Sequence, residues 1–182
     1  MGGHMRKVST RFRFLAAIVL TLSTVASGSS AFANSPLGLF DNQEDYPKGP
    51  RIELTPGSVC QTPTARRYPE HIAYCARSVA SSLKREIIQQ YDRQFGYHIG
   101  QMPRGEFKID HYIPLCAGGS NEADNLWPQH ESVYTITDPL EPAVCDKMSQ
   151  GRLLQADAIA LIKEAKNDLS KVPAILQHIQ SL

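Results

Sequence analysis

Four side chains of the kinds found in hydrolytic metal sites fall within twenty-one residues of one another. They are the carboxylate of Asp110, the imidazoles of His111 and His130, and the amide of Asn125. A carboxylate and an imidazole can hold one divalent cation. A second imidazole, with an ordinary pKa of about 6.5, can take a proton from water at neutral pH. These groups therefore predict a hydrolytic site of the phosphodiesterase type, provided that the chain folds back between residues 111 and 125.

Two short strands around a glycine turn are predicted to bring these groups together. Apolar residues alternate in the segment that ends at Asp110-His111, Leu126-Trp127 begins a second apolar run, and Gly118-Gly119 lies between them. Adjacent residues at a strand end point to opposite sides, so Asp110 and His111 can face a cation and a water molecule separately. Asn125 can hydrogen-bond across the turn and fix the backbone that carries His111, or it can be a turn residue only.

A helix is predicted before the hairpin. Apolar residues recur in steps of three and four from Ile72 to Tyr91, and Gly96 is a suitable stop. Ser78 or Ser81 is a suitable N-cap if this helix starts late. A turn-rich connector then leads to the first strand.

Three further helices are predicted after the hairpin, over residues 138–151, over residues 153–166 and from residue 173 onward. Asp138 and Glu141 have the spacing of a capping box around Pro139. The order of one helix, two strands and then more helices predicts a small α+β domain, with Trp127 in its core.

Residues 1–33 are expected to be a signal peptide, with a cloning remnant at residues 1–4. Basic residues precede a short apolar run, and Ala31-Phe32-Ala33 matches a small-x-small cleavage site. The run is too short for a membrane span, so none is expected after signal removal; an uncleaved anchor is the alternative. Residues 34–57 are expected to be an irregular lead-in and residues 58–182 the functional domain.

The charge balance excludes one class of protein. Without the leader the chain has 15 basic and 18 acidic residues, which excludes a globally basic nucleic-acid coat. Residues 51–108 nevertheless carry nine Lys or Arg against five Asp or Glu, while the residues from 109 onward carry five against ten. A positive surface near the site can still meet phosphate.

The four cysteines indicate two disulfides in an exported chain. Three pairings exist, and sequence proximity favours Cys60 with Cys75, which leaves Cys116 to pair with Cys145. The second bridge would clamp the helix of residues 138–151 against the hairpin. The chain contains no Cys-x-x-Cys pair, so a structural zinc site is poorly supported.

The spacing from Asp110-His111 through Gly118-Gly119 to Asn125 resembles that of HNH endonucleases of the ββα-metal (His-Me finger) class. More narrowly, residues 107–130 resemble an exported bacterial branch with the signature DHxxPL…GG…NLWPQ. The resemblance implies an α+β fold in which additional helices flank a ββα-metal hairpin-helix core, stabilised by disulfides. It also implies that His111 is the general base, that Asp110 is a metal ligand, and that Asn125 orients the His111 loop.

The sequence departs from this family at the last metal ligand, because the usual position holds Tyr134. His130 is taken as the ligand instead, with Glu131 and Glu141 as alternatives. The residues expected to bind phosphate are Arg104 and Lys108, with Arg77 and Lys84 as weaker candidates.

The resemblance implies a metal-dependent endonuclease that cuts DNA, with RNA as an open alternative, and has little sequence preference. The expected signal peptide places it in the periplasm or outside the cell. It implies products with a 5′-phosphate and a free 3′-hydroxyl. Mg²⁺ is the expected ion, Mn²⁺ a substitute, and Zn²⁺ an ion that could bind tightly and inhibit. Two rivals are a catalytically inactive, disulfide-stabilised binding module on the same fold and a metal-dependent hydrolase of another phosphate ester. The sequence does not fix the oligomeric state.

Overall fold

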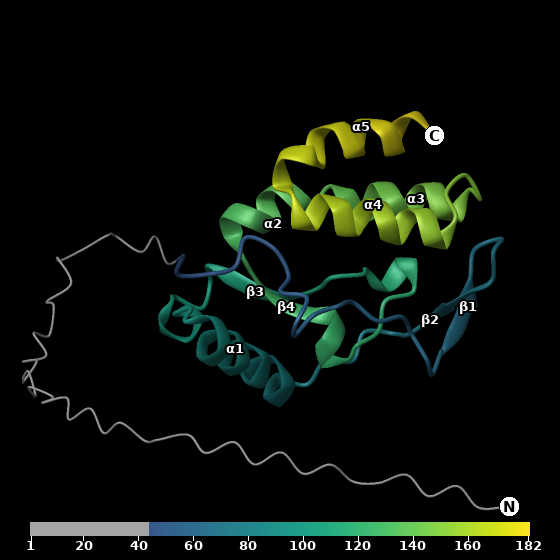
Figure 1. The fold of residues 1–182 in the computed structure, drawn as a ribbon. Coiled ribbons are helices and arrows are strands. Elements are labelled where there is room, and N and C mark those ends of the chain that lie inside the picture. The colour runs from purple at the N-terminus through teal and green to yellow at the C-terminus, as the bar shows by residue number, and fades with distance from the viewer. Residues whose placement is uncertain (1–43) are drawn as a thin grey trace, which may run out of the picture. The chain divides into compact units, whose positions relative to one another are not determined.

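The computed structural model describes residues 44–182. The expected signal peptide and the first part of the expected lead-in lie outside the described residues. In Figure 1 the hairpin of β3 and β4 lies between helix α1 and a layer formed by the later helices. This arrangement confirms the predicted α+β class.

The predicted hairpin is formed by β3 (Phe107–His111) and β4 (Leu126–His130), which pair antiparallel. Asp110 pairs with Trp127, and His111 pairs with Leu126. Between the strands lie two short 3₁₀ turns, η2 (Leu115–Ala117) and η3 (Ala123–Asn125). The hairpin therefore places Asp110 and His111 at its loop end, opposite the start of β4.

The helix predicted from Ile72 starts later than its apolar pattern indicates. Ile72–Tyr74 is strand β2, paired antiparallel with β1 (Ala65–Arg67), and helix α1 covers Ser81–Phe95. Ile72 pairs with Arg67, and the Cys75 disulfide ties the following segment to Cys60, so this stretch stays extended. The predicted stop is confirmed, because Gly96 takes a left-handed conformation with φ 73°. The short turn η1 (Ile99–Gln101) follows.

Four α-helices and one 3₁₀ turn follow β4 in the described chain. They are α2 (Glu131–Thr137), α3 (Leu140–Ser149), α4 (Gln155–Asn167), η4 (Leu169–Lys171) and α5 (Val172–Ser181). The predicted capping box before α3 is wrong. Asp138 and Pro139 both have right-handed helical dihedrals, so α2 passes into α3 without the extended residue that a capping box requires.

Two apolar clusters hold the hairpin on both sides. One joins α1 to the hairpin and contains Trp127, which is fully buried as predicted. The other joins α3, α4 and α5 to the loop after β3, through Ile113 and Ala117. The loop that follows the Asp110-His111 pair is therefore anchored in the larger core.

The described part of the expected lead-in, residues 44–57, forms no helix or strand but packs against the domain. The Thr55 hydroxyl is fully buried and donates to the Leu126 carbonyl at 3.0 Å. The Tyr91 hydroxyl accepts from the Arg51 backbone N–H at 3.1 Å. Residues 51 and 55 of the lead-in therefore pack on the domain that is predicted to begin at residue 58.

Both predicted disulfides are present, Cys60–Cys75 and Cys116–Cys145, and the second joins the loop after β3 to α3 as expected. Two disulfides are consistent with folding in an oxidising compartment. Within residues 44–182, no helix combines the length and apolar character needed to cross a bilayer.

Candidate functional site

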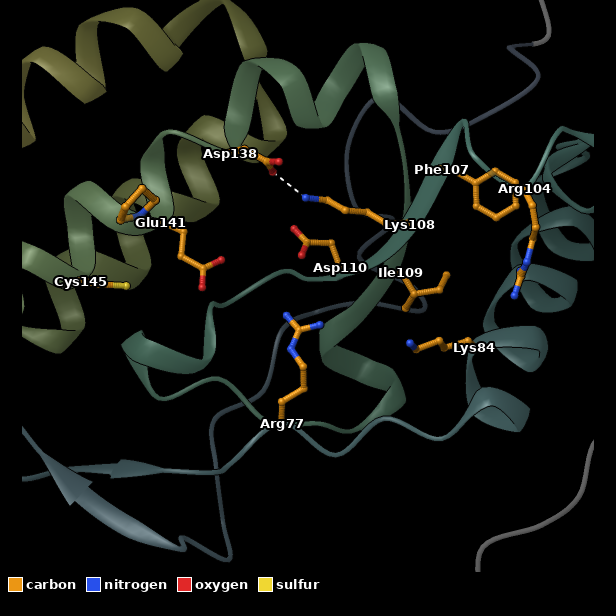
Figure 2. Close-up of a pocket in the computed structure, with 11 residues that line it drawn as sticks. Arg77, Lys84, Arg104, Phe107, Lys108, Ile109, Asp110, Asp138, Glu141 and Cys145 are labelled. Carbon is orange, nitrogen blue, oxygen red and sulfur yellow. Dashed lines mark hydrogen bonds and ion pairs between the residues drawn. The ribbon is translucent and has the colours of Figure 1, made fainter.

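An open cavity of about 670 Å³ runs along the edge of β3 that does not pair with β4. Consecutive residues from Phe107 to Asp110 line it, because an unpaired strand edge exposes both faces of the strand. Figure 2 shows Asp110 and Glu141 turned toward each other near the centre, with basic side chains around them. The cavity therefore combines an acidic centre with a basic rim.

The Asp110 carboxylate forms an ion pair with a buried lysine of α4. The Lys166 ammonium donates to Asp110 Oδ2 at 3.2 Å, and the two side chains are only 5% and 13% exposed, respectively. The same ammonium donates to the carbonyl oxygen of His111. Burial alone would raise the pKa of Asp110, but the positive charges of Lys166 and Lys108 outweigh it and hold that pKa below its usual value. Asp110 is thus ionised at neutral pH.

The His111 ring is 3% exposed and is oriented by Asn121. Asn121 Nδ2 donates to the Ala76 carbonyl at 2.8 Å, and Asn121 Oδ1 accepts from the Ser78 N–H at 3.2 Å. These two bonds fix which end of the amide faces His111, so His111 Nε2, 3.2 Å from Oδ1, must be the nitrogen that carries the proton. In the neutral ring, Nδ1 is then the free base.

The electrostatic surroundings keep His111 neutral. Burial lowers the pKa of His111, the hydrogen bond to Asn121 raises it, and the nearby charge of Arg77 lowers it again. The net effect is a pKa below the ordinary histidine value. The ring is therefore unprotonated at neutral pH.

Asn125 makes the hydrogen bonds predicted for it. Its side chain is fully buried; Oδ1 accepts from the Ile113 N–H at 2.9 Å, and Nδ2 donates to the carbonyls of Ile113 and Ser120 at 3.0 Å. The Gly-Gly segment is a tight packing point in this loop, because a Cβ on Gly119 would lie 1.8 Å from the Ile113 carbonyl oxygen. Asn125 and Gly119 together fix the backbone just after His111.

Two further carboxylates line the cavity, Asp138, which is paired with Lys108, and Glu141. In the case of Glu141, the surroundings raise the pKa. Partial desolvation by the cavity walls raises its pKa, and the negative charge of Asp110 raises it further. Within residues 44–182, no hydrogen bond or ion pair engages its carboxylate. Asp110 and the unpaired Glu141 offer the oxygen donors that hard divalent cations prefer. The residues present therefore fit a cation.

His130 does not belong to this donor set, and its prediction as a metal ligand beside Asp110 is wrong. It pairs with Phe107, three strand positions or roughly 10 Å away from Asp110. Its ring stacks on Tyr46 with a centroid separation of 3.8 Å, and its Nδ1 accepts from the Ser132 N–H at 3.2 Å. His130 therefore caps α2. Glu131, the other alternative, lies in the first turn of α2 and does not line the cavity.

The cations predicted to bind phosphate do line the cavity. Lys108 is ion-paired with Asp138 at 2.6 Å, whereas Arg77, Lys84 and Arg104 have no acidic partner within the described chain. Unpaired cations are the ones available to an anionic ligand. The two residues considered weaker candidates are thus as well placed as Arg104.

One further cluster of ligand-type atoms is excluded as a metal centre. The sulfur atoms of Cys116 and Cys145 and a carboxylate oxygen of Glu141 lie within 4.8 Å of one another. Both sulfurs are committed to a disulfide and offer no thiolate. Glu141 is therefore left to act with Asp110.

Two residues that matter here were missed by the sequence reasoning. Lys166 interrupts the apolar stripe of α4 formed by Ala158, Ile162 and Ala165, and a lysine next to such a stripe signals a buried partner. Asn121 gave no comparable signal, because a polar residue in a turn is ordinary.

The chain was compared with protein-family models, with curated proteins and with solved structures, and none of the three comparisons found a match.

Proposed function

We propose that this protein is a divalent-metal-dependent phosphodiesterase of the HNH type that acts on nucleic acid outside the cytoplasm. One observation carries the proposal: Asp110 and Glu141 face a cavity whose cations include the unpaired Arg77, Lys84 and Arg104. A neutral, oriented histidine, His111, follows Asp110 directly in the chain; it is buried and does not itself line that cavity. The resemblance of residues 107–130 to HNH endonucleases supports the same reaction. The ligand pair is Asp110 with Glu141, in place of the predicted Asp110 with His130.

Each group has a role that its surroundings support. Nδ1 of His111 accepts a proton from water while the water oxygen bonds to phosphorus, and Asn121 and Asn125 hold the ring and its loop in place. The bond from phosphorus to the leaving sugar oxygen breaks, and that oxygen takes a proton from solvent. Arg77 lines the cavity, and its charge lowers the pKa of His111. Its guanidinium neutralises negative charge on the phosphate.

Asp110 and Glu141 would hold the cation. When bound, such an ion supplies positive charge at a non-bridging phosphate oxygen and at the leaving oxygen. Lys166 leaves one oxygen of Asp110 free for this role, because its hydrogen bond is to Oδ2. Oxygen ligands favour Mg²⁺ or Mn²⁺, and the exclusion of His130 removes the reason to expect tight Zn²⁺ binding.

The decisive test is the degradation of supercoiled plasmid by the disulfide-bonded protein in Mg²⁺. We expect nicking and linearisation that EDTA abolishes and that His111→Ala reduces at least 100-fold. His178→Ala is the matched control, because His178 is exposed on α5, away from the cavity. Cleavage that survives His111→Ala would refute the mechanism. Binding of plasmid without cleavage would point to the inactive binding module, and cleavage of a small chromogenic diester alone would point to another phosphate ester.

A further inference from the structure

A second, smaller cavity of about 200 Å³ adjoins the first, and the two share Arg104 and Phe107 in their walls. Figure 2 shows the Phe107 ring and the Arg104 side chain together at the end of the large cavity away from Glu141. The small cavity lies between α1 and the connector that leads to β3. A ligand that enters the large cavity at Asp110 can therefore continue into the small one.

The walls of the small cavity suit a flat, apolar ring. Phe107, Ile88 and Met102 supply apolar surface, and Arg85 and Arg104 supply guanidinium groups. Guanidinium planes and aromatic faces both stack on rings. Pockets for drug-sized ligands occupy about 300–1,000 Å³, so this cavity has room for a single small ring system.

The floor of the cavity is rigid. Phe107 is the first residue of β3, is half-buried, and packs against the cluster between α1 and the hairpin. The Asp92 carboxylate accepts from the N–H groups of Ile99 and Gly100 at 2.9 and 2.8 Å, which fixes the turn on the opposite side. A ring that stacks on Phe107 would meet a surface that is already in place, so little ordering would oppose binding.

Phe107 also lies near enough to Asp110 for one nucleotide ligand to reach both residues. It lies three residues before Asp110 on the same strand, roughly 10 Å away along the chain. Arg104, which lies between the two cavities, can contact a phosphate on one side and a ring on the other. Trp127, the most obvious aromatic platform in the sequence, is fully buried and has no face to offer.

We propose that the small cavity is a nucleobase subsite, in which the base of a nucleotide next to the cleaved phosphate stacks on Phe107. This inference rests on the proposed function and names the part of the substrate that its site reads. Stacking depends on a π face that every base has, so the subsite accepts all four bases without selecting among them. It requires an unpaired base, and single-stranded nucleic acid is therefore the preferred substrate.

The test is the binding of two tetranucleotides to the non-cleaving His111→Ala protein in Ca²⁺. One carries 2-aminopurine, whose fluorescence falls when it stacks, and the other carries an abasic residue at the same position. We expect quenching on binding, and affinity for the 2-aminopurine strand about 5- to 150-fold above that for the abasic strand. Adding Phe107→Leu, which keeps an apolar side chain but removes the ring, should erase the difference, and adding Phe107→Tyr, which keeps the ring, should preserve it.

The outcomes separate this inference from the proposed function. If the wild-type protein cleaves plasmid but Phe107→Leu leaves the preference for the 2-aminopurine strand unchanged, the subsite is refuted and the nuclease stands. If the wild-type protein cleaves neither plasmid nor single-stranded DNA or RNA but quenching depends on Phe107, the subsite stands and the nuclease is refuted. A protein that binds neither strand would overturn both.

Discussion

Replacing Lys166 with methionine should leave the buried Asp110 carboxylate without its ion-pair partner and lower the free energy of unfolding. Methionine keeps most of the apolar stem of the lysine but removes the ammonium that donates to Asp110 Oδ2 and to the His111 carbonyl. The Asp110 carboxylate would then face a nearly closed environment, since its side chain is only 13% exposed. An uncompensated buried charge of this kind is among the most destabilising changes a single substitution can make.

The size of the effect follows from the burial of both partners. Removal of one partner of a buried ion pair costs about 3–5 kcal/mol, and side chains that are 5% and 13% exposed belong in that class. The double variant Lys166→Met with Asp110→Asn should lose less than the sum of the single losses, because it leaves no unpaired charge. We expect an interaction free energy of at least about 1 kcal/mol from this cycle.

The pH dependence has a definite sign. In the wild-type protein the pKa of Asp110 is lowered, so the stability contributed by the pair is present above the unfolded pKa and is lost as the pH falls through the folded value. In Lys166→Met, burial without the cation raises that pKa, so the penalty is present at neutral pH and is relieved by protonation at acid pH. The difference in stability between the two proteins should therefore shrink as the pH is lowered.

The assay is urea unfolding at 25 °C in EDTA with both disulfides intact, at pH 7 and at acid pH. A loss smaller than 1 kcal/mol at pH 7, or fully additive effects in the cycle, would refute the reasoning. Adding Mg²⁺ should stabilise Lys166→Met more than the wild-type protein, because a bound cation replaces part of the missing charge.

Three further outcomes are expected. Glu141→Gln should weaken Mn²⁺ binding at least 10-fold by calorimetry. The free energy of unfolding should fall by less than about 0.5 kcal/mol, because the side chain is exposed. An unchanged Mn²⁺ affinity would exclude Glu141 as a ligand. Asn121→Asp should shift the acid limb of the pH–rate profile upward, because a negative charge beside His111 raises a pKa that is lowered in the wild-type protein; an unmoved limb would contradict the assigned base. Replacing Cys116 and Cys145 with serine should cost about 3–4 kcal/mol in urea unfolding, as expected for a 29-residue separation, and a loss below 1 kcal/mol would argue against the clamp.

Local parts of the site could be predicted from the sequence. Asp110, His111 and Asn125 lie on one hairpin, so alternation and turn residues were enough to bring them together. The same local reasoning failed for His130, because the ligand chemistry of a histidine says nothing about strand register, and the register places this residue beside Phe107.

Contacts between distant segments could not be predicted in this way. Glu141 has the spacing of a capping residue, and only the near-continuous path from α2 to α3 shows that its carboxylate is free to face Asp110. Lys166 reaches Asp110 across fifty-six residues of sequence, a pairing that no local pattern specifies. Ile72 fits a helical stripe equally well, but pairing with Arg67 makes it part of a strand.

In the proposed function, the covalent link between Cys116 and Cys145 would affect which ions the cavity can take. Asp110 comes from β3 and Glu141 from α3, and the bridge ties the loop after β3 to that helix. The gap between the two carboxylates is thereby restrained before any ion arrives. Mg²⁺ requires oxygens at about 2.0–2.1 Å and Ca²⁺ accepts about 2.3–2.6 Å, so a restrained gap makes ionic radius a criterion for selection. Opening the bridge should relax that discrimination.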